Sequence, residues 1–203
     1  MQAALFAAAL AGIFLLMKPD QGWFLLAAAF WLLIAPLWLW RGVTAGHKRI
    51  LALAGVVVLL PAGLAMATLP AQQVLAVLVL TWIADTAAYF AGMRWGRHKL
   101  APSISPGKTW EGAAGGLAAV LAYALILLFF ARSIAWAPFV AAAGLLGVLS
   151  IVGDLFESAA KRQASVKDSG ALLPGHGGIL DRIDSATSTL PIAAALAPWI
   201  VGK

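Results

Sequence analysis

The chain has 203 residues, of which 63% are hydrophobic and 11% charged, and its mean hydropathy is +0.93. Soluble domains carry about 25% charged residues, so this composition excludes an ordinary soluble protein and favours an integral membrane protein. The formal net charge is +6 and cysteine is absent, which excludes disulfides, thiolate metal sites and cysteine nucleophiles.

Apolar runs long enough to cross a hydrocarbon core of about 30 Å recur along the whole chain. They do not alternate apolar and polar residues, which favours helices over transmembrane strands. We therefore predict an all-α fold, a polytopic transmembrane helical bundle with about seven spans, and close helix packing at Gly112, Gly115 and Gly116. The predicted spans are 2–17, 22–40, 50–68, 71–92, 112–131, 136–153 and 186–201.

Basic residues are distributed unequally between the two sides that these spans define. Connectors 41–49, 93–111 and 154–185 lie on one side and carry eleven of the fourteen Lys and Arg residues. These eleven are Arg41, Lys48, Arg49, Arg94, Arg97, Lys99, Lys108, Lys161, Arg162, Lys167 and Arg182. Because connectors rich in Lys and Arg stay in the cytoplasm, we predict that these connectors and the N-terminus are cytoplasmic. This bias and contact with anionic lipid headgroups explain the net charge without a nucleic-acid partner.

Two polar helical stripes flank a glycine-rich link near the C-terminus. Polar residues from Asp154 to Ser165 recur at helical spacing, and those from Asp181 to Ser188 form a second stripe. The link can fold back and bring the carboxylates of the two stripes together, where cations must offset their charge. Mg²⁺ prefers carboxylate oxygens and bridges them to substrate phosphate. The alternative for 161–168 is a solvated face at the membrane surface.

A second group of polar residues surrounds the end of the fourth predicted span. Asp85 lies roughly 10 Å from that end at 1.5 Å per residue, so it should line a polar cavity or pair with a basic residue. The segment SPGKTWEG, 105–112, is not a P-loop, because Pro102 stands where the first glycine is required. Lys108 and Thr109 instead precede a helix whose N-terminal amides can hold phosphate. The alternative is a capped helix start with a lysine that contacts lipid headgroups.

These segments resemble the phosphatidate cytidylyltransferase family, also called CDP-diacylglycerol synthase. The family signature combines Ser, Lys-Arg, Lys-Asp, a Pro-x-His-Gly-Gly turn and Asp-Arg-x-Asp at fixed spacing. Residues 158–184, SAAKRQASVKDSGALLPGHGGILDRID, fit every fixed position, and Ala160 replaces a larger apolar residue at a variable one. GDLFES at 153–158 and the 105–112 segment are also similar to the family, so the resemblance covers roughly residues 81–188.

The resemblance implies a nucleotidyl transfer in which CTP and phosphatidic acid give CDP-diacylglycerol and pyrophosphate. It implies Mg²⁺ as the cofactor and leaves a second cation open. It also implies a homodimer in a bacterial inner membrane, with a site open to the cytoplasm and to membrane lipids. Residues 71–203 would form the catalytic part, integrated with N-terminal helices at 1–70 that carry no family motif.

The same resemblance implies roles for individual residues. The metal ligands would be Asp154, Asp181 and Asp184, and the catalytic residues would be Asp154, Asp181, Lys167 and Asp168. The substrate-binding residues would be Lys161, Arg162, His176, Gly177, Gly178, Arg182, Asp85, Ser105, Lys108 and Thr109. Because the lipid phosphate is already ionised at neutral pH, no general base is needed and His176 is not assigned as one.

Other functions stay open on the sequence. A CTP-dependent lipid kinase shares the substrates but transfers the γ-phosphoryl group, and a synthase for another lipid phosphate shares the chemistry. A membrane transporter would use Asp85 and Asp154 as ion sites. Transporters often carry inverted repeats, and this chain shows no internal repeat.

Overall fold

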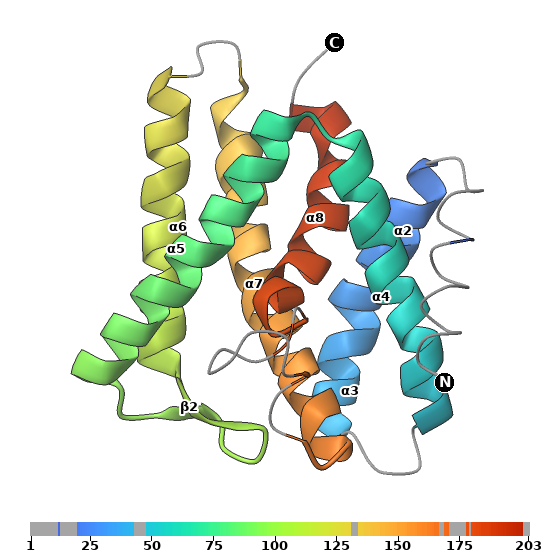
Figure 1. Ribbon diagram of the computed structural model, residues 1–203. Helices are drawn as coiled ribbons and strands as arrows, with labels where there is room; N and C mark the ends of the chain where they lie inside the picture. The colour runs from blue at the N-terminus through green and yellow to red at the C-terminus, as the bar shows by residue number, and fades with distance from the viewer. Residues whose placement is uncertain are drawn as a thin grey trace.

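The computed structural model describes residues 12, 20–42, 48–130, 134–166, 169–170, 178 and 180–200. In these residues the chain forms helices and one short β-hairpin (Figure 1). The elements are α2 (Gln21–Ala29), η1 (Phe30–Ile34), α3 (Ala35–Arg41), α4 (Lys48–Thr68), α5 (Ala71–Trp95), β1 (Lys99–Ala101), β2 (Ser105–Thr109), α6 (Trp110–Phe130), α7 (Trp136–Gln163) and α8 (Leu180–Ile200). η1 is a π-helical turn that joins α2 and α3, and Pro36, which has no N–H to donate, is the second residue of α3.

Five helices among the described residues are long and apolar enough to cross a membrane. They are Gln21–Arg41, Ile50–Thr68, Ala71–Trp95, Trp110–Phe130 and Trp136–Gln163. Each overlaps a predicted span, so the prediction of a multi-pass helical membrane protein is confirmed. The first predicted span, 2–17, lies outside the described residues apart from Gly12, and the last falls in α8.

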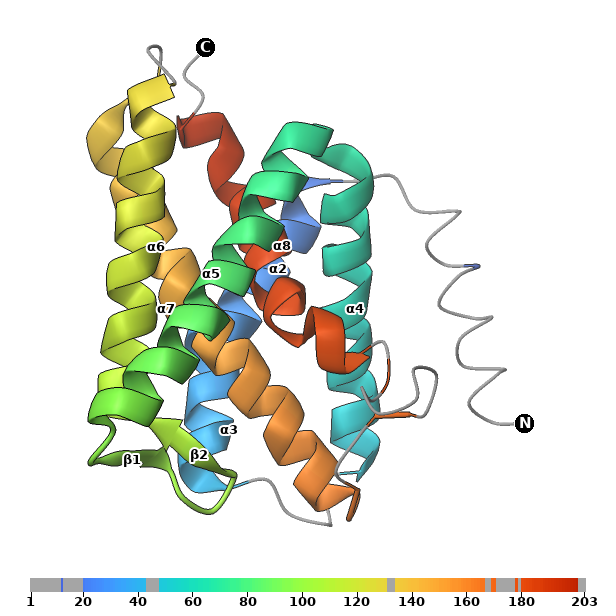
Figure 2. The ribbon, with the colours of Figure 1, turned by 60° about the vertical axis from the view of Figure 1, so that its left-hand side comes forward.

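Helix α8 is the central helix of the bundle and is polar for that position. It packs against α7, α4, α2 and α5 (Figures 1 and 2). Its buried hydroxyls bond to the neighbouring helix: Ser188 Oγ donates to the Leu149 carbonyl at 2.8 Å, and Ser185 Oγ to the Ser150 carbonyl at 3.3 Å. Because other helices surround it, α8 can carry hydroxyls that lipid would disfavour. This explains why α8 does not meet the apolar criterion of the other five.

The β-hairpin between α5 and α6 is a local feature that the sequence does not predict within the otherwise helical fold. β1 and β2 pair antiparallel, where the sequence predicts only a turn that leads into a helix. Glu111, at the start of α6, accepts the backbone N–H groups of Arg97 at 3.1 Å and His98 at 3.2 Å. The hairpin therefore depends on a side chain beyond its own residues, which local turn chemistry does not predict.

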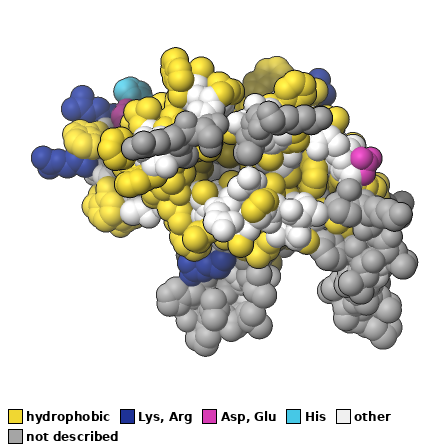
Figure 3. Space-filling model, turned by 90° about the horizontal axis from the view of Figure 1, so that it is seen from above, with side chains coloured by type: hydrophobic (Ala, Val, Ile, Leu, Met, Phe, Trp, Pro, Cys, Tyr) yellow, Lys and Arg dark blue, Asp and Glu magenta, His cyan; other side chains and the backbone are white. Residues whose placement is uncertain are grey.

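The connectors that were predicted to share one side lie together. The C-terminal ends of α3, α5 and α7, the starts of α4 and α6, and the hairpin all lie at one end of the bundle, at the bottom of Figure 1. Seen from the opposite end, the molecule presents mainly hydrophobic side chains, and charged groups appear at its periphery (Figure 3). The end that carries the hairpin is called the hairpin end below.

Helices α5 and α6 approach each other through glycines. A Cβ on Gly112 would lie 2.8 Å from the carbonyl oxygen of Ala88, and one on Gly116 would lie 2.8 Å from that of Ala84. No side chain fits at such distances, so the predicted close packing is confirmed. The contact places Asp85 of α5 beside the first turns of α6.

Candidate active site

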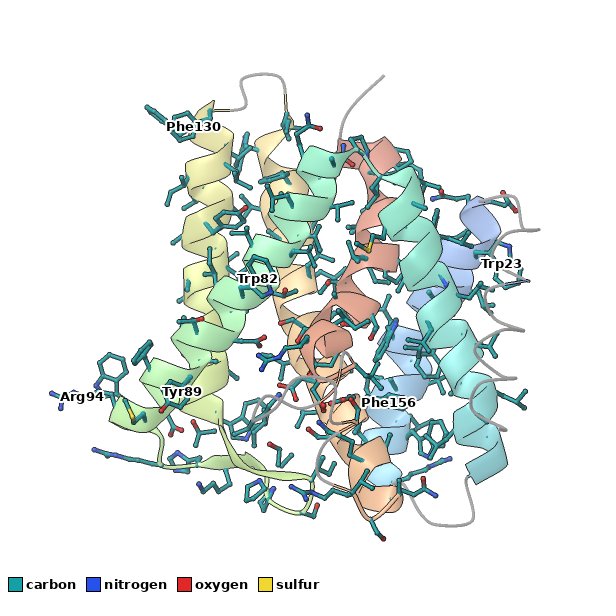
Figure 4. The ribbon with its side chains drawn as sticks, in the orientation of Figure 1. Trp23, Trp82, Tyr89, Arg94, Phe130 and Phe156 are labelled. Carbon is teal, nitrogen blue, oxygen red and sulfur yellow. The ribbon has the colours of Figure 1, made fainter. Side chains whose placement is uncertain are left out.

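A polar pocket of about 550 Å³ lies at the hairpin end, between the hairpin and helices α5, α6, α7 and α8. Its charged residues are Asp85, Lys99, Lys108, Asp154, Asp181 and Asp184. Tyr89, on the lower part of α5, lines the same pocket (Figure 4). The pocket thus joins the two polar segments that stand out in the sequence, around Asp85 and around the C-terminal carboxylates.

Asp154 lies on α7 and is paired with a lysine from the hairpin. Its Oδ2 lies 2.5 Å from Nζ of Lys108, and its Oδ1 accepts a hydrogen bond from Ser158 Oγ at 3.3 Å. The side chains of Lys108 and Asp154 are 25% and 26% exposed, so water still reaches the ion pair. The pair ties the hairpin to α7 and places an ammonium group among the pocket carboxylates.

The polar stripe of α7 is helical as predicted up to Gln163, but it does not reach Ser165. Val166 N–H donates to the Lys161 carbonyl and Ser165 N–H to the Arg162 carbonyl, both at 3.0 Å. Ser165 has a φ of 58° in the left-handed region, which ends the helix in a Schellman motif. The predicted extension of the stripe to Ser165 is therefore wrong. The sequence has no glycine at this position to indicate that the helix ends here.

Asp181, in the first turn of α8, accepts four contacts. Lys161 Nζ lies 2.6 Å from Oδ1, and Oδ2 accepts from Ser169 N at 2.9 Å, Ser169 Oγ at 2.8 Å and Gly178 N at 2.7 Å. Partial burial alone would raise the pKa of Asp181, but these donors outweigh it and hold the pKa well below its usual range. Asp181 is therefore an anion that fixes the chain on either side of the glycine-rich link.

Asp85 and Asp184 are the other carboxylates of the pocket. Asp184 Oδ1 accepts the backbone N–H of Ser185 at 2.7 Å. Asp154 lies close enough to repel both Asp85 and Asp184 electrostatically. In the described part of the chain, no three His, Asp or Glu side chains converge tightly enough to form a metal site by themselves. The pocket is thus rich in oxygen donors that lack a preformed ligand cage.

The other predicted site residues within the described structure differ in their relation to the pocket. Arg162 Nε donates to the Ile104 carbonyl at 3.4 Å and so ties the end of α7 to the hairpin. Thr109 lines the pocket, and its hydroxyl accepts the Gly112 N–H at 3.1 Å, as expected of a capped helix start. Ser105 also lines the pocket. Arg182 has an exposed side chain on α8 and is not among the residues that line the pocket.

Four predicted residues, Lys167, Asp168, His176 and Gly177, lie outside the described residues. Their roles stay predictions from the family signature. Gly178, which follows them, is buried and donates its N–H to Asp181. That amide is used inside the protein, whereas the family resemblance implies a substrate-binding role for Gly178.

Three residues of this region have no predicted site role: Tyr89, Lys99 and Glu157. Tyr89 and Lys99 line the pocket, and Glu157 lies 2.7 Å from Lys161 Nζ. A signal exists for two of them, because Tyr89 follows Asp85 by four residues and Glu157 precedes Lys161 by four. Lys99 reaches the pocket only because the hairpin folds, so helical spacing gives no indication of it.

Comparison with known proteins identifies the family. The sequence profile of the Cytidylyltransferase family matches residues 2–199. Phosphatidate cytidylyltransferase of Pseudomonas aeruginosa is 43% identical over 189 residues, which cover 88% of this chain and 69% of that protein. The Haemophilus influenzae enzyme of that name is 46% identical over 120 residues, covering 57% of this chain and 42% of the relative. The enzyme of that name from Thermotoga maritima is 40% identical over 129 residues, which cover 61% of this chain and 48% of the relative.

The aligned regions are unequal in extent. The match spans about two thirds of the Pseudomonas relative and less than half of the other two. The profile match, in contrast, covers nearly the whole chain, including both polar segments that form the pocket. The chain belongs to the cytidylyltransferase family.

Proposed function

We propose that this protein transfers the cytidylyl group of CTP to phosphatidate and so forms CDP-diacylglycerol in phospholipid synthesis. An oxygen of the lipid phosphate attacks the α-phosphorus of CTP, the bond from that phosphorus to the β-phosphate oxygen breaks, and pyrophosphate leaves. The observation that carries the proposal is the pocket itself, in which carboxylates and lysines gather among helices apolar enough to cross a membrane. Such a pocket can bind a water-soluble nucleotide and a lipid headgroup at the same time.

The reaction joins two strongly anionic groups, so positive charge must screen them and stabilise the transition state. Lys99 and Lys108 face the pocket and supply such charge from the hairpin. Lys108 now pairs with Asp154. We infer that an incoming triphosphate competes with Asp154 for this ammonium group and leaves Asp154 available to a cation.

The pocket carboxylates suit a divalent cation such as Mg²⁺, which prefers oxygen ligands and often takes several of them from substrate phosphates. When bound, Mg²⁺ would neutralise phosphate charge and stabilise the charge that develops in the transition state. Asp154 and Asp184 are our first candidates for ligands, because both line the pocket. Asp181 has its oxygens engaged by Lys161, Ser169 and Gly178, so its predicted role as a ligand requires Lys161 to move away.

The hairpin end would face the cytoplasm of a bacterial cell, in its inner membrane. The concentration of Lys and Arg in connectors at this end supports the orientation. The two ends of the chain lie on the same side of the membrane when the number of spans is even. With the predicted seven spans they would lie on opposite sides. The cytoplasmic N-terminus and the homodimer implied by the family resemblance stay predictions.

The direct test is product analysis with the purified protein in detergent micelles, supplied with CTP, phosphatidate and Mg²⁺. We expect CDP-diacylglycerol and pyrophosphate in equal amounts by mass spectrometry, and neither after chelation of the metal. CDP together with a newly phosphorylated lipid would instead identify a lipid kinase. Activity with a different lipid phosphate alone would identify another synthase, and failure to consume CTP with any lipid would contradict the proposal.

A further inference from the structure

Glu157 is a buried carboxylate to which the proposed reaction assigns no role. Glu157 is 7% exposed, and its Oε2 lies 2.7 Å from Nζ of Lys161. Neither carboxylate oxygen makes a hydrogen bond within the described structure, so the short contact is an ion pair without hydrogen-bond alignment. Burying a carboxylate costs free energy that such a contact offsets poorly. Stability alone therefore does not explain this residue.

The backbone beneath Glu157 is held in place by an aromatic cluster. The ring of Phe156 packs edge-on against those of Phe30, Trp31 and Trp38, with centroids 5.4, 5.6 and 5.6 Å away. Figure 4 shows Phe156 between α7 and α3. Because its neighbour is anchored in this way, Glu157 presents its charge at a fixed position on α7.

Glu157 is the first member of a chain of contacts that ends at the pocket. Lys161 Nζ lies between Glu157 and Asp181, at 2.7 and 2.6 Å. Asp181 in turn accepts the N–H groups of Ser169 and Gly178. One ammonium group thus bridges α7 to α8, and the contacts continue to both sides of the glycine-rich link.

We propose that Glu157 is a positioning residue that keeps Lys161 on Asp181 and thereby holds the first turn of α8, with Asp184, at the wall of the pocket. A lysine held by one carboxylate can swing toward other anions, whereas a lysine held by two carboxylates stays between them. The kinetic part of this inference rests on the proposed cytidylyl transfer, and the positioning part does not.

The substitution Glu157→Gln tests the proposal, because it keeps the shape of the side chain and removes its charge. We expect faster hydrogen exchange at the amides of Ser169 and Gly178, since Asp181 loses its fixed partner. Turnover should fall about 10–100-fold, as is usual when an outer support of a functional site is removed. The melting temperature should stay equal or rise. Glu157→Asp, which keeps the charge, should restore much of the protection and of the turnover.

A matched control is Glu111→Gln, which removes the charge of a carboxylate that accepts the backbone N–H groups of Arg97 and His98. It should speed exchange at Arg97 and His98 and leave Ser169 and Gly178 protected. Unchanged exchange at Ser169 and Gly178 in Glu157→Gln would overturn the proposal, and so would activity lost only in proportion to unfolding. If the unsubstituted protein made no CDP-diacylglycerol, the proposed function would fail, while the exchange result would still decide the role of Glu157.

Discussion

Helices α5, α6, α7 and α8 line a cavity at each end of the bundle, and the two cavities differ in chemistry. The hairpin end holds the carboxylate pocket of about 550 Å³. The opposite end holds a cavity of about 140 Å³ with an almost wholly apolar lining, including Val77, Leu80 and Leu146. The same four helices therefore form both, and the helix scaffold alone does not determine which end can bind phosphate.

The difference comes from what surrounds the helix ends. At the hairpin end, β2 supplies Lys108 and the first turn of α8 supplies Asp181. At the opposite end, Tyr123, which lines the cavity, donates a hydrogen bond from its Oη to the Ala76 carbonyl at 3.3 Å. The hairpin and the helix segments beside it therefore supply the residues that can act on phosphate. Substitutions at the two ends should separate effects on activity from effects on stability.

The largest effect is expected for Asp154→Asn, in the lining of the polar pocket. It removes a candidate cation ligand and the partner of Lys108 while keeping the shape of the side chain. We expect kcat to fall about 10²–10³-fold, comparable to the loss of one important electrostatic contact to a transition state. Steady-state turnover over a range of Mg²⁺ concentrations measures it. Activity near that of the unsubstituted protein would remove Asp154 from the site.

Lys108→Ala should have the next largest effect. If Lys108 moves from Asp154 to the triphosphate, its loss should lower kcat/KM for CTP roughly 10–100-fold. Lys108→Arg should recover part of this loss, because it keeps the charge but not the geometry. A change in the KM for lipid alone would show that Lys108 serves the lipid and not the nucleotide.

Gly116→Leu should lower stability, because Gly116 lies where α5 and α6 touch. Its Cβ would meet the Ala84 carbonyl oxygen at 2.8 Å, and a backbone atom cannot rotate away as a side chain can. We expect a loss of about 1–3 kcal/mol in the free energy of unfolding. Gly144→Ala is a suitable control, since its Cβ would lie 3.6 Å from Leu121. Equal melting temperatures for both variants would contradict the packing argument.

The smallest effect is expected at the apolar end. Tyr123→Phe removes the hydrogen bond to Ala76 and should cost about 0.5–1.5 kcal/mol of stability. Turnover should stay within twofold of the unsubstituted protein, because the residue lines the cavity remote from the carboxylates. A large drop in turnover at full stability would show that the two ends are functionally coupled.

Much of this organisation could be predicted from sequence. Hydropathy identifies the five apolar helices, and helical spacing places Asp154 and Ser158 on one face, where they bond. Helix α8 was found as an apolar run, but its start at Leu180 and its central position depend on packing against α7. The spacing of residues within one helix thus predicts which side chains lie on the same face of that helix.

Pairing between elements is what the sequence does not show. The β2 strand reads SPGKT, and proline and glycine are depleted in strands, so propensity argues against it. The spacing of charges also cannot tell that Lys108 pairs with Asp154 while Lys161 pairs with Asp181. Those choices depend on the tertiary contacts between hairpin, α7 and α8.

The central claim is that the carboxylate pocket moves the cytidylyl group of CTP to a lipid phosphate. The most direct measurement supplies CTP labelled at either the α- or the γ-phosphorus, together with phosphatidate and Mg²⁺, and follows the label into extracted lipid. The claim predicts α-label in the lipid of the unsubstituted protein, γ-label only in pyrophosphate, and little of either label in lipid with Asp154→Asn. Lipid that carries the γ-label and no α-label would contradict it.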